Sequence, residues 1–292
     1  MTAPPIAVLM ACHNRRELTL RCLASLADQP LFDPANLFLV DDGSIDGTAE
    51  AVRDMHPAAN LIAGDGNLFW NGGMRRAWEA AKAAGEFDFY LWLNDDVVVA
   101  PGTLAALVAD ADSAAPRGGA VIVAAATSEP GDPARITYGG HRRSDPARRF
   151  RLELVAPVGQ PAPLDSISGN IVLVAAAAER VLGNLTPRLT HIYGDIDYGF
   201  RARAAGIPMV LASRIGGTCA ANSVTGSSLD PNLPRSARLR RRWREDRSLH
   251  ARDWRRFVAL HGGPLAVFKH WVGPYLRIMA GSRREGSAHV PG

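Results

Sequence analysis

The sequence predicts an α/β protein built on a mostly parallel β-sheet. Short apolar runs at residues 6–10, 37–40 and 87–93 have the length and composition of buried strands. Stretches with helical spacing of apolar residues separate these runs, and strands that alternate with helices typically form parallel sheets. Each run also ends in a polar loop. Because the carboxyl ends of parallel strands share one crevice, we expect functional residues to gather there.

The first hundred residues follow this alternation closely. Polar loops come after the first three strands, at residues 12–15, 41–44 and 64–73. The expected order of elements is strand 6–10, helix 18–26, strand 37–40, helix 51–55, strand 61–62, helix 74–81 and strand 87–93.

The pattern loosens after Pro101. A helix through residues 104–108 leads to a strand at 120–124, and residues 127–163, rich in Gly, Pro and Arg, are expected to form loops and short hairpins on the substrate side. Ser168-Gly169-Asn170 then opens an apolar strand at 171–174. A last helix begins at Gly194-Asp195 and ends at Gly206, a typical residue for a helix carboxyl end.

The acidic pair Asp95-Asp96 stands directly after the apolar run 87–93. Buried charge is costly unless a positive group meets it, and Mg²⁺ or Mn²⁺ prefers carboxylate oxygens and is often shared with substrate phosphates. The pair therefore indicates a divalent cation site. A solvated turn or a helix cap is the alternative for so short a motif.

Composition limits the class of protein. At 292 residues and 47% hydrophobic content, the chain fits one catalytic domain with a carboxyl-terminal appendage. No leader sequence or membrane-spanning run is recognisable, so a cytoplasmic protein is expected. Cys12, Cys22 and Cys219 are widely spaced, which favours reduced thiols over a disulfide framework or a zinc site.

Basic residues are concentrated near the carboxyl terminus. The net charge is only +4, but arginines dominate Arg235–Arg256 and an aromatic-rich amphipathic stretch follows. Such a segment suggests an anionic partner, and the aromatic continuation favours a membrane surface over nucleic acid. A helical hairpin packed on the main domain with a solvated arginine face is the alternative. We expect no nucleic-acid partner.

Three motifs, taken in order, carry a resemblance to a known family. They are Val40-Asp41-Asp42-Gly43-Ser44, then Asn94-Asp95-Asp96, then Gly194-Asp195-Ile196-Asp197-Tyr198 before a helix. Over residues 5–220 the chain resembles the family 2 glycosyltransferases, which have the GT-A fold with its Rossmann-like nucleotide-binding sheet. The segment from Gly66-Asn67 to Gly72-Gly73 is similar to the rhamnosyltransferase-like branch, which builds bacterial surface polysaccharides.

The resemblance implies a domain organisation. Residues 1–225 would form the GT-A domain, with nucleotide-sugar binding in 1–100 and the acceptor side in 101–225. Residues 226–292 would form a basic, amphipathic helical segment.

The resemblance also implies a nucleoside-diphosphate sugar as donor. Asp42 matches the aspartate that binds the nucleobase, Asp41 would orient it or cap the turn, and Asp95 matches the carboxylate near the ribose. An Asx-turn without a ligand is the alternative for the Asp41-Asp42 pair.

His13 would stack on the base or bond to it, unless it is a partly exposed loop residue. Trp70 would contact the donor or else belong to the core, while Asn71 would cap its helix and the glycines would leave room for the donor. The expected donor-binding residues are Ala11, His13, Asn14, Asp41, Asp42, Asn67, Trp70, Asn71, Gly72, Gly73 and Asp95.

Asp96 matches the family's metal ligand, which would hold Mn²⁺ or Mg²⁺ against the departing diphosphate. Asp195 matches the catalytic base, and a helix start would stabilise its ionised form. Plain helix capping is the alternative for Asp195. By the same analogy, Ser168, Gly169, Asn170 and Asp197 would line the acceptor or sugar pocket, although Asp197 could instead support the loop.

Two positions depart from the family pattern. Gly194 stands where relatives carry Glu before the base, and Cys219 stands where many carry a metal-binding His. A soft thiolate suits Mg²⁺ poorly, so Cys219 is expected to be a packing residue, with Asn222 or water completing the coordination.

The expected activity is inverting transfer of a sugar from a UDP- or dTDP-sugar, such as dTDP-rhamnose, to a glycan or polyprenyl-linked acceptor. The alternatives are a non-catalytic sugar-nucleotide or membrane-binding module, and a sugar-phosphate nucleotidyltransferase. The second lacks support because Ala11-Cys12-His13-Asn14 supplies no glycine-rich phosphate loop.

Overall fold

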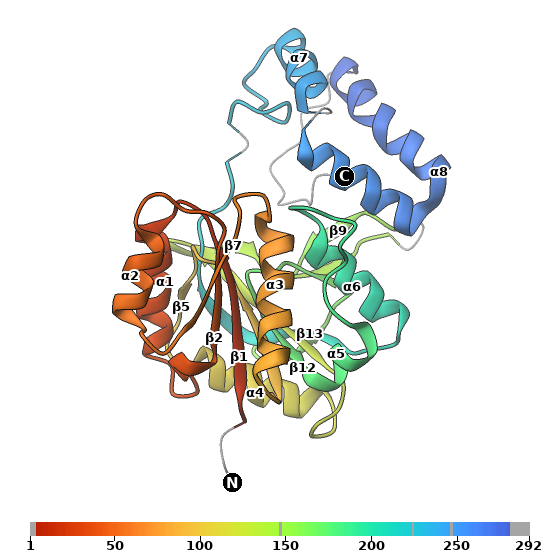
Figure 1. Cartoon of the computed structure of the whole chain (residues 1–292). Coiled ribbons are helices and arrows are strands. Elements are labelled where there is room, and N and C mark those ends of the chain that lie inside the picture. Colours follow the sequence, from red (N-terminus) through yellow and green to blue (C-terminus); the bar gives the residue numbers. More distant parts are fainter. Residues whose placement is uncertain (1–3, 146–147, 224, 246–247, 281–292) are drawn as a thin grey trace.

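The computed structural model describes residues 4–145, 148–223, 225–245 and 248–280. A ten-stranded sheet forms its centre, and helices cover both faces (Figure 1). The strand order along the main path is β10-β13-β6-β12-β4-β1-β2-β3. This architecture confirms the predicted α/β class.

The amino-terminal half is the parallel part of the sheet. Strand β1 pairs in parallel with β2 and β4, and β2 pairs in parallel with β3. These strands are almost fully apolar because helices cover both of their faces. Their bounds are β1 Ile6–Cys12, β2 Leu37–Asp41, β3 Asn60–Ala63 and β4 Phe89–Leu93.

The other half of the sheet is mixed. Strand β12 is antiparallel to both of its neighbours, β4 and β6, whereas β13 runs parallel to β6. Strands β5, β7 and β10 add antiparallel pairs at the margins, and β11-β8-β9 form a second, three-stranded sheet. The bounds are β5 Val98–Val99, β6 Ile122–Glu129, β7 Asp132–Tyr138, β8 Gly140–Arg143, β9 Leu152–Leu154, β10 Ala162–Pro163, β11 Ser166–Ile167, β12 Ile171–Ala175 and β13 Met209–Thr218.

The predicted end of the strand at residue 124 is wrong, because β6 continues to Glu129. Strand β7 pairs with the end of β6 in a hairpin, and hairpins are expected in this region. Thr127 is fully buried and its hydroxyl bonds that of Thr137 at 2.9 Å, so polar side chains here belong to a sheet rather than to a loop.

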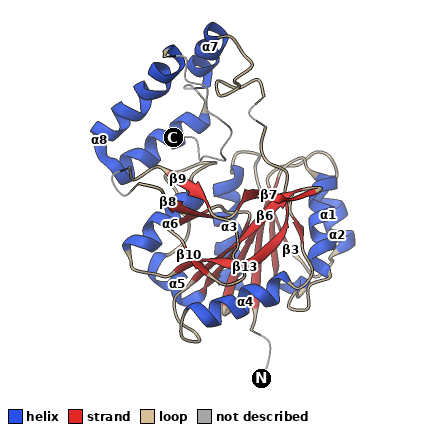
Figure 2. Cartoon of the chain, turned by 180° about the vertical axis from the view of Figure 1, so that it is seen from behind, coloured by secondary structure: helices blue, strands red, loops and turns tan. Residues whose placement is uncertain are grey.

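Two hydrophobic layers hold the helices to the sheet. One side contains α1, α2 and α4, and the other contains α3, α5 and α6. Helix α3 crosses the front of the sheet in Figure 1, and α4 covers the opposite face in Figure 2. The bounds are α1 Arg16–Ala27, α2 Thr48–Met55, α3 Phe69–Ala84, α4 Thr103–Ala114, α5 Ala176–Leu182 and α6 Gly194–Ala204, with a short 3₁₀ turn at Pro34–Asn36.

The carboxyl-terminal helices lie above the carboxyl ends of the parallel strands (Figure 1). They are α7 Arg235–Glu245 and α8 Leu249–Met279, and α8 kinks at Gly263, whose φ is 75°, just before Pro264. A third cluster of buried apolar residues packs the first half of α8 against α6, through Trp254, Phe257 and Tyr193 among others. Within the described residues, no helix combines the length and the apolar character needed to cross a bilayer.

Candidate active site

The acidic pair lies where the sequence predicts, directly after β4 at the carboxyl edge of the sheet. Asp95 is buried and Asp96 is partly exposed. Both pair with one guanidinium: Nη1 of Arg15 lies 2.9 Å from Oδ1 of Asp95 and 3.0 Å from Oδ2 of Asp96. Arg15 follows β1, so the loops after two neighbouring parallel strands meet here, as open α/β sheets require.

The charge balance of this pair depends on burial. Desolvation and the charge of Asp96 raise the pKa of Asp95, the Arg15 guanidinium lowers it, and the net result is a pKa of about 6. The Arg15 guanidinium supplies one positive charge for two adjacent carboxylates. A second cation would therefore stabilise their ionised forms.

Cys219 reaches the same place from the end of β13. Its Sγ lies 3.5 Å from Oδ1 of Asp96 and receives the amide of Asn170 at 3.6 Å. Burial, together with the Asp96 charge, raises the pKa of the Cys219 thiol to about 12. At neutral pH the Cys219 side chain is therefore a buried, protonated thiol.

The carboxylate oxygens of Asp95 and Asp96 suit a metal cation that a ligand also binds. The described residues contain no cluster of three or more His, Cys, Asp or Glu side chains arranged around one metal position. Mg²⁺ and Mn²⁺ are commonly held by one or two carboxylates together with substrate phosphates, which Asp95 and Asp96 can supply. A cage made entirely by the protein does not fit these residues.

Asp195 lies in the first turn of α6, and the residue is partly exposed. Oδ2 accepts the Gly169 N–H at 2.8 Å, and Oδ1 accepts the Ile196 N–H at 2.8 Å. Tyr193, not Asp195, is the N-cap residue of α6, and the Asp195 carboxylate accepts one N–H of the first turn, that of Ile196. Desolvation raises the pKa of Asp195, and these two N–H bonds lower it, so the expected stabilisation of the ionised form by N–H groups is present but is outweighed by burial.

Trp70 connects the acidic pair to Asp195. Its indole N–H donates to Oδ1 of Asn94 at 2.7 Å, next to Asp95. The same ring covers Gly169, where an added Cβ would lie 2.6 Å from Cζ2 of Trp70 and 3.4 Å from Cβ of Asp195. Trp70 is half-buried and packs against the core tryptophan Trp92, so it borders both the core and the site.

Asn71 fills the space next to Gly194. A Cβ at Gly194 would lie 2.0 Å from Oδ1 of Asn71, which is far inside van der Waals contact. The Asn71 amide donates to the carbonyls of Thr186 and Leu189 at 2.9 and 2.7 Å. Asn71 therefore does not cap α3 as predicted, because the helix begins at Phe69 and the side chain binds the loop that leads to α6.

On the donor side, Asp42 fixes the loop between β3 and α3. Its two carboxylate oxygens accept the N–H groups of Gly66 at 2.8 Å and Phe69 at 2.9 Å, and the side chain is buried. Asp41 accepts the Ser44 N–H at 3.0 Å, which is the turn-capping role predicted for it. The Asn67 backbone and amide bond to Asp65.

The loop after β1 is tied to the loop after β2. Nδ1 of His13 donates to the Asp42 carbonyl at 2.6 Å, and Oδ1 of Asn14 accepts the Ile45 N–H at 2.8 Å. His13 is exposed, so its ring keeps a face open. The structure thus brings the predicted residues of both loops together at the carboxyl edge.

The two glycines of α3 have different surroundings. Gly73 is buried, and a Cβ there would lie 2.7 Å from Cβ of Ala11, so this glycine allows α3 to pack closely on β1. Gly72 is partly exposed, and a Cβ there would lie 3.3 Å from Cβ of Leu68.

The predicted acceptor residues divide into two groups. Gly169 and Asn170 face the site through Asp195 and Cys219. Ser168 instead bonds the buried imidazole of His141 at 2.8 Å. Asp197 is buried, with its carboxylate bound to Arg201 at 3.0 Å and to His261 at 2.8 Å, which is the loop-supporting alternative.

Strained backbone surrounds this site. Among the described residues, three that are not glycine have positive φ: Asn14 at 51°, Phe69 at 52° and Tyr193 at 67°. They lie in the loop after β1, at the start of α3 and directly before α6. Such conformations persist only where surrounding contacts impose them, and they cluster at functional sites.

Sequence reasoning missed several residues of this site. Arg15 and Asn94 stand directly next to the predicted residues Asn14 and Asp95. Arg15 is the last residue of the polar loop at 12–15, and its positive charge beside predicted binding residues was a signal in the sequence. Asp253 and His261 belong to α8, far along the chain, and no local pattern marks them. They reach the site only through the packing of α8 on α6.

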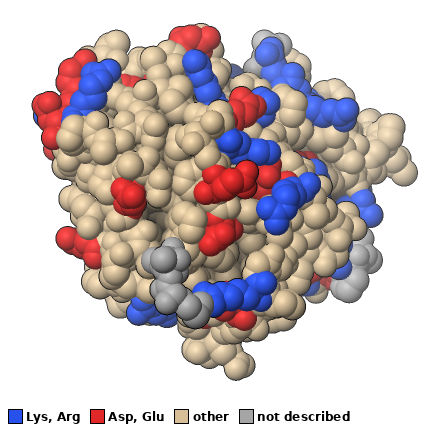
Figure 3. Space-filling model, turned by 60° about the horizontal axis from the view of Figure 1, so that its bottom comes forward, with Lys and Arg blue, Asp and Glu red and all other residues tan. Residues whose placement is uncertain are grey.

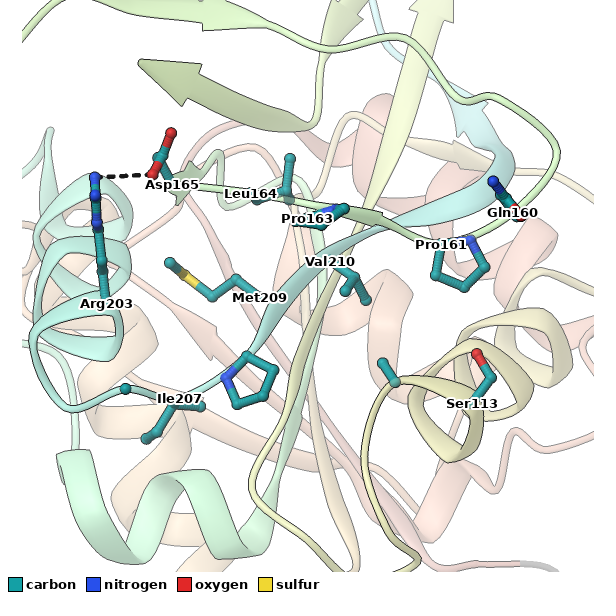
Figure 4. A pocket seen from close by; sticks show the side chains of 13 residues that line it. Ser113, Gln160, Pro161, Pro163, Leu164, Asp165, Arg203, Ile207, Met209 and Val210 are labelled. Atoms are coloured by element: carbon teal, nitrogen blue, oxygen red, sulfur yellow. Dashed lines mark ion pairs between the residues drawn. The ribbon is translucent and has the colours of Figure 1, made fainter. Parts of the chain in front are cut away.

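The described residues also line a cavity of about 560 Å³ elsewhere in the molecule. It lies at the amino end of β13, beside β10, and an Asp165–Arg203 ion pair of 2.8 Å closes one side (Figure 4). None of the predicted site residues lines it. On the face in Figure 3, acidic and basic side chains are interspersed without a large patch of one sign among the described residues.

An α/β sheet with polar loops at its carboxyl edge is the arrangement in which open α/β proteins bind their ligands. The family model of glycosyl transferase family 2 matches residues 7–157, just over half of the chain. The chain therefore belongs to glycosyl transferase family 2.

A curated relative supports the assignment. The N-acetylglucosaminyl-diphospho-decaprenol L-rhamnosyltransferase of Mycobacterium tuberculosis is 28% identical over 227 residues, which cover 70% of this chain and 71% of that protein. The chain is thus a glycosyltransferase similar to a rhamnosyltransferase, and the non-catalytic alternative is not favoured.

Solved structures share its fold. The mannosyltransferase PcManGT from Pyrobaculum calidifontis, in complex with GDP-Man and Mn²⁺, has a TM-score of 0.54 and 17% identity, and the match covers 98% of this chain and 77% of that one. S. aureus TarS 1-349 in complex with UDP-GlcNAc has a TM-score of 0.54 and 14% identity, over 94% and 81% of the two chains. These likenesses confirm the GT-A fold.

Proposed function

We propose that this protein is an inverting glycosyltransferase that moves a sugar from a UDP- or dTDP-sugar, such as dTDP-rhamnose, to a hydroxyl of a glycan or polyprenyl-linked acceptor in bacterial surface polysaccharide synthesis. The observation that carries the proposal is the connection of Asp95-Asp96 to Asp195 through Asn94, Trp70 and Gly169. The relative's name, with its decaprenol-linked acceptor, supports the acceptor class.

In this proposal Asp195 removes the proton of the acceptor hydroxyl while that oxygen attacks the anomeric carbon. Asp96, with Asp95, holds Mn²⁺ or Mg²⁺, which would neutralise charge on the departing diphosphate. Trp70 keeps the two carboxylate groups at a fixed separation. A single displacement of this kind inverts the configuration at the anomeric carbon.

The test is release of nucleoside diphosphate from a panel of UDP-, dTDP- and GDP-sugars, with and without Mn²⁺ or Mg²⁺. We expect metal-dependent release from one donor class, lost in Asp96→Ala and strongly reduced in Asp195→Asn. Asp112→Asn, which changes an exposed carboxylate on α4, is the matched control and should behave as the wild type. No release from any donor, even with membrane extract as acceptor, would contradict the proposal.

We also propose that α7 and the second half of α8 bind an anionic membrane surface, where a lipid-linked acceptor would lie. After the kink at Gly263, Leu265 and Phe268 are 81% and 61% exposed. Leu276 and Met279 are also exposed and fall on the same face of the helix. Helix α7 carries six arginines at positions 235, 238, 240, 241, 242 and 244. An exposed apolar stripe beside basic residues suits an anionic bilayer.

The arginine run is not uniformly solvated, because Arg238 is buried and donates to the Ser228 carbonyl at 3.0 Å. Cosedimentation with vesicles that contain phosphatidylglycerol should therefore depend on the apolar stripe as well as on salt. Leu265→Ser with Phe268→Ser should abolish most of the binding, whereas Val181→Ser, a comparably exposed apolar residue on α5, should not. Equal vesicle binding by the wild type, the double variant and Val181→Ser would contradict the proposal.

A further inference from the structure

One carboxylate oxygen on α8 receives three backbone N–H groups of the loop before α6. Oδ2 of Asp253 lies 3.0 Å from the amide nitrogen of Thr190, 2.7 Å from that of His191 and 3.2 Å from that of Ile192. Asp253 has no solvent exposure. Consecutive N–H groups that converge on one anion form a strong, charge-assisted set of bonds.

This loop leads directly to the proposed catalytic base. Ile192 is followed by Tyr193, whose positive φ of 67° turns the chain into α6, and Asp195 lies in the first turn of that helix. Asn71 holds the earlier part of the loop through the carbonyls of Thr186 and Leu189. The donor side therefore fixes one end of the loop, and the carboxyl-terminal helix fixes the other.

A second set of contacts joins the same two elements. Nε2 of His261 lies 2.8 Å from Oδ1 of Asp197, two residues after Asp195. The Tyr193 ring packs on Trp254 at 5.0 Å and on Phe257 at 5.5 Å, both from α8. The strained turn at Tyr193 is thus held from the α8 side by packing as well as by hydrogen bonds.

We propose that Asp253 is a positioning residue for the catalytic base, so that α8 sets the place of the Asp195 carboxylate relative to Gly169 and the acidic pair. The inference rests on the proposed role of Asp195. It gives the carboxyl-terminal segment a part in catalysis that is separate from membrane binding. A 1 Å displacement of a catalytic group can cost about 100-fold in rate.

A purely structural role for Asp253 would give a different result. In that case its loss would lower stability and leave the turnover of the folded protein unchanged. Asp230 offers a matched control, because it is also buried in the carboxyl-terminal region and accepts the N–H groups of Gly226 at 2.7 Å and Asn232 at 2.9 Å. It lies in the segment before α7 and makes none of the contacts with the 190–192 loop.

The experiment compares wild type, Asp253→Asn, Asp253→Glu and Asp230→Asn as full-length proteins. Hydrogen exchange of the amides of residues 190–192 gives a readout that does not depend on activity. Steady-state release of nucleoside diphosphate from the donor identified above gives kcat and the donor KM.

We expect Asp253→Asn to lose amide protection at residues 190–192 and to lower kcat by about 10- to 100-fold, with the donor KM within about twofold. Asp253→Glu should keep part of the amide protection and part of the kcat. Asp230→Asn should match wild type in amide protection and in kcat. If Asp253→Asn does not fold, the same pattern in Asp253→Glu, with a smaller fall in kcat, supports the proposal.

Unchanged protection, or a kcat in the folded variants equal to that of Asp230→Asn, would overturn the positioning role. If wild type releases no nucleotide, the function proposed above fails, while the exchange measurement still shows whether Asp253 orders the loop.

Discussion

Asp195 combines features that suit a general base. The residue is only partly exposed, and Trp70, which covers Gly169, and the loop around it desolvate its carboxylate. Desolvation raises its pKa, and a base with a pKa nearer to neutrality takes up a proton more readily. The N–H groups of Gly169 and Ile196 oppose this rise, which keeps the ionised form accessible.

The pH dependence of turnover follows from this environment. The base must be ionised, so kcat should fall as pH falls through the pKa of Asp195, and that midpoint should lie above about 3.9, the ordinary Asp value. Asp195→Asn should lower kcat by about 10²- to 10⁴-fold and remove this acid limb.

The measurement is kcat against pH at saturating donor and metal, so that protonation of Asp95, with its pKa of about 6, does not weaken cation binding and distort the profile. An acid limb that persists in Asp195→Asn would assign the base to another residue.

At the scale of elements, the contact between α3 and α6 decides how the two halves of the site meet. Gly194 has no side chain, and Asn71 of α3 occupies the adjoining space while its amide holds the loop at 186–189. This contact gives a physical reason why position 194 is glycine here and not the Glu of the family pattern. The Asn71 side chain occupies the space that a side chain at position 194 would need.

Gly194→Ala should therefore destabilise the protein by about 1–3 kcal/mol, because overpacking forces Asn71 out of its bonds. Adding Asn71→Ala should recover much of the loss caused by the clash, which a double-mutant cycle measures as a coupling. Gly273→Ala, on α8 with open space at its Cβ, is the control and should cost little. Additive effects of the two site changes would show that the contact is absent.

The helices and strands of the amino-terminal half were predictable because each carries a local signal. The strands β1, β2 and β4 are apolar on both faces, and polar loops mark their carboxyl ends. The extent of β6 and β7 was not predictable, because buried threonines such as Thr127 and Thr137 bond each other inside the sheet. In the sequence they look like loop residues.

At the scale of the whole molecule, the acidic pair and Asp195 could be located from the sequence because their motifs adjoin elements with clear patterns. Their partners could not. Arg15 meets Asp95, 80 residues away, only in the folded chain. Asp253 likewise meets the loop before Asp195 only there, at His191, 62 residues away. The division of the chain at residue 225 stays a prediction, and the packing of α8 on α6 ties the carboxyl-terminal segment to the domain.

The central claim is that donor diphosphate, cation and acceptor meet between Asp96 and Asp195. A crystal structure with Mn²⁺ and the donor identified by nucleotide release tests it most directly. The account predicts a cation bound by Asp96 and the diphosphate, Arg15 displaced from at least one of its two carboxylates, and the anomeric carbon facing Asp195. A nucleotide bound elsewhere, for example in the cavity beside β10, with Arg15 still paired to both Asp95 and Asp96, would contradict it.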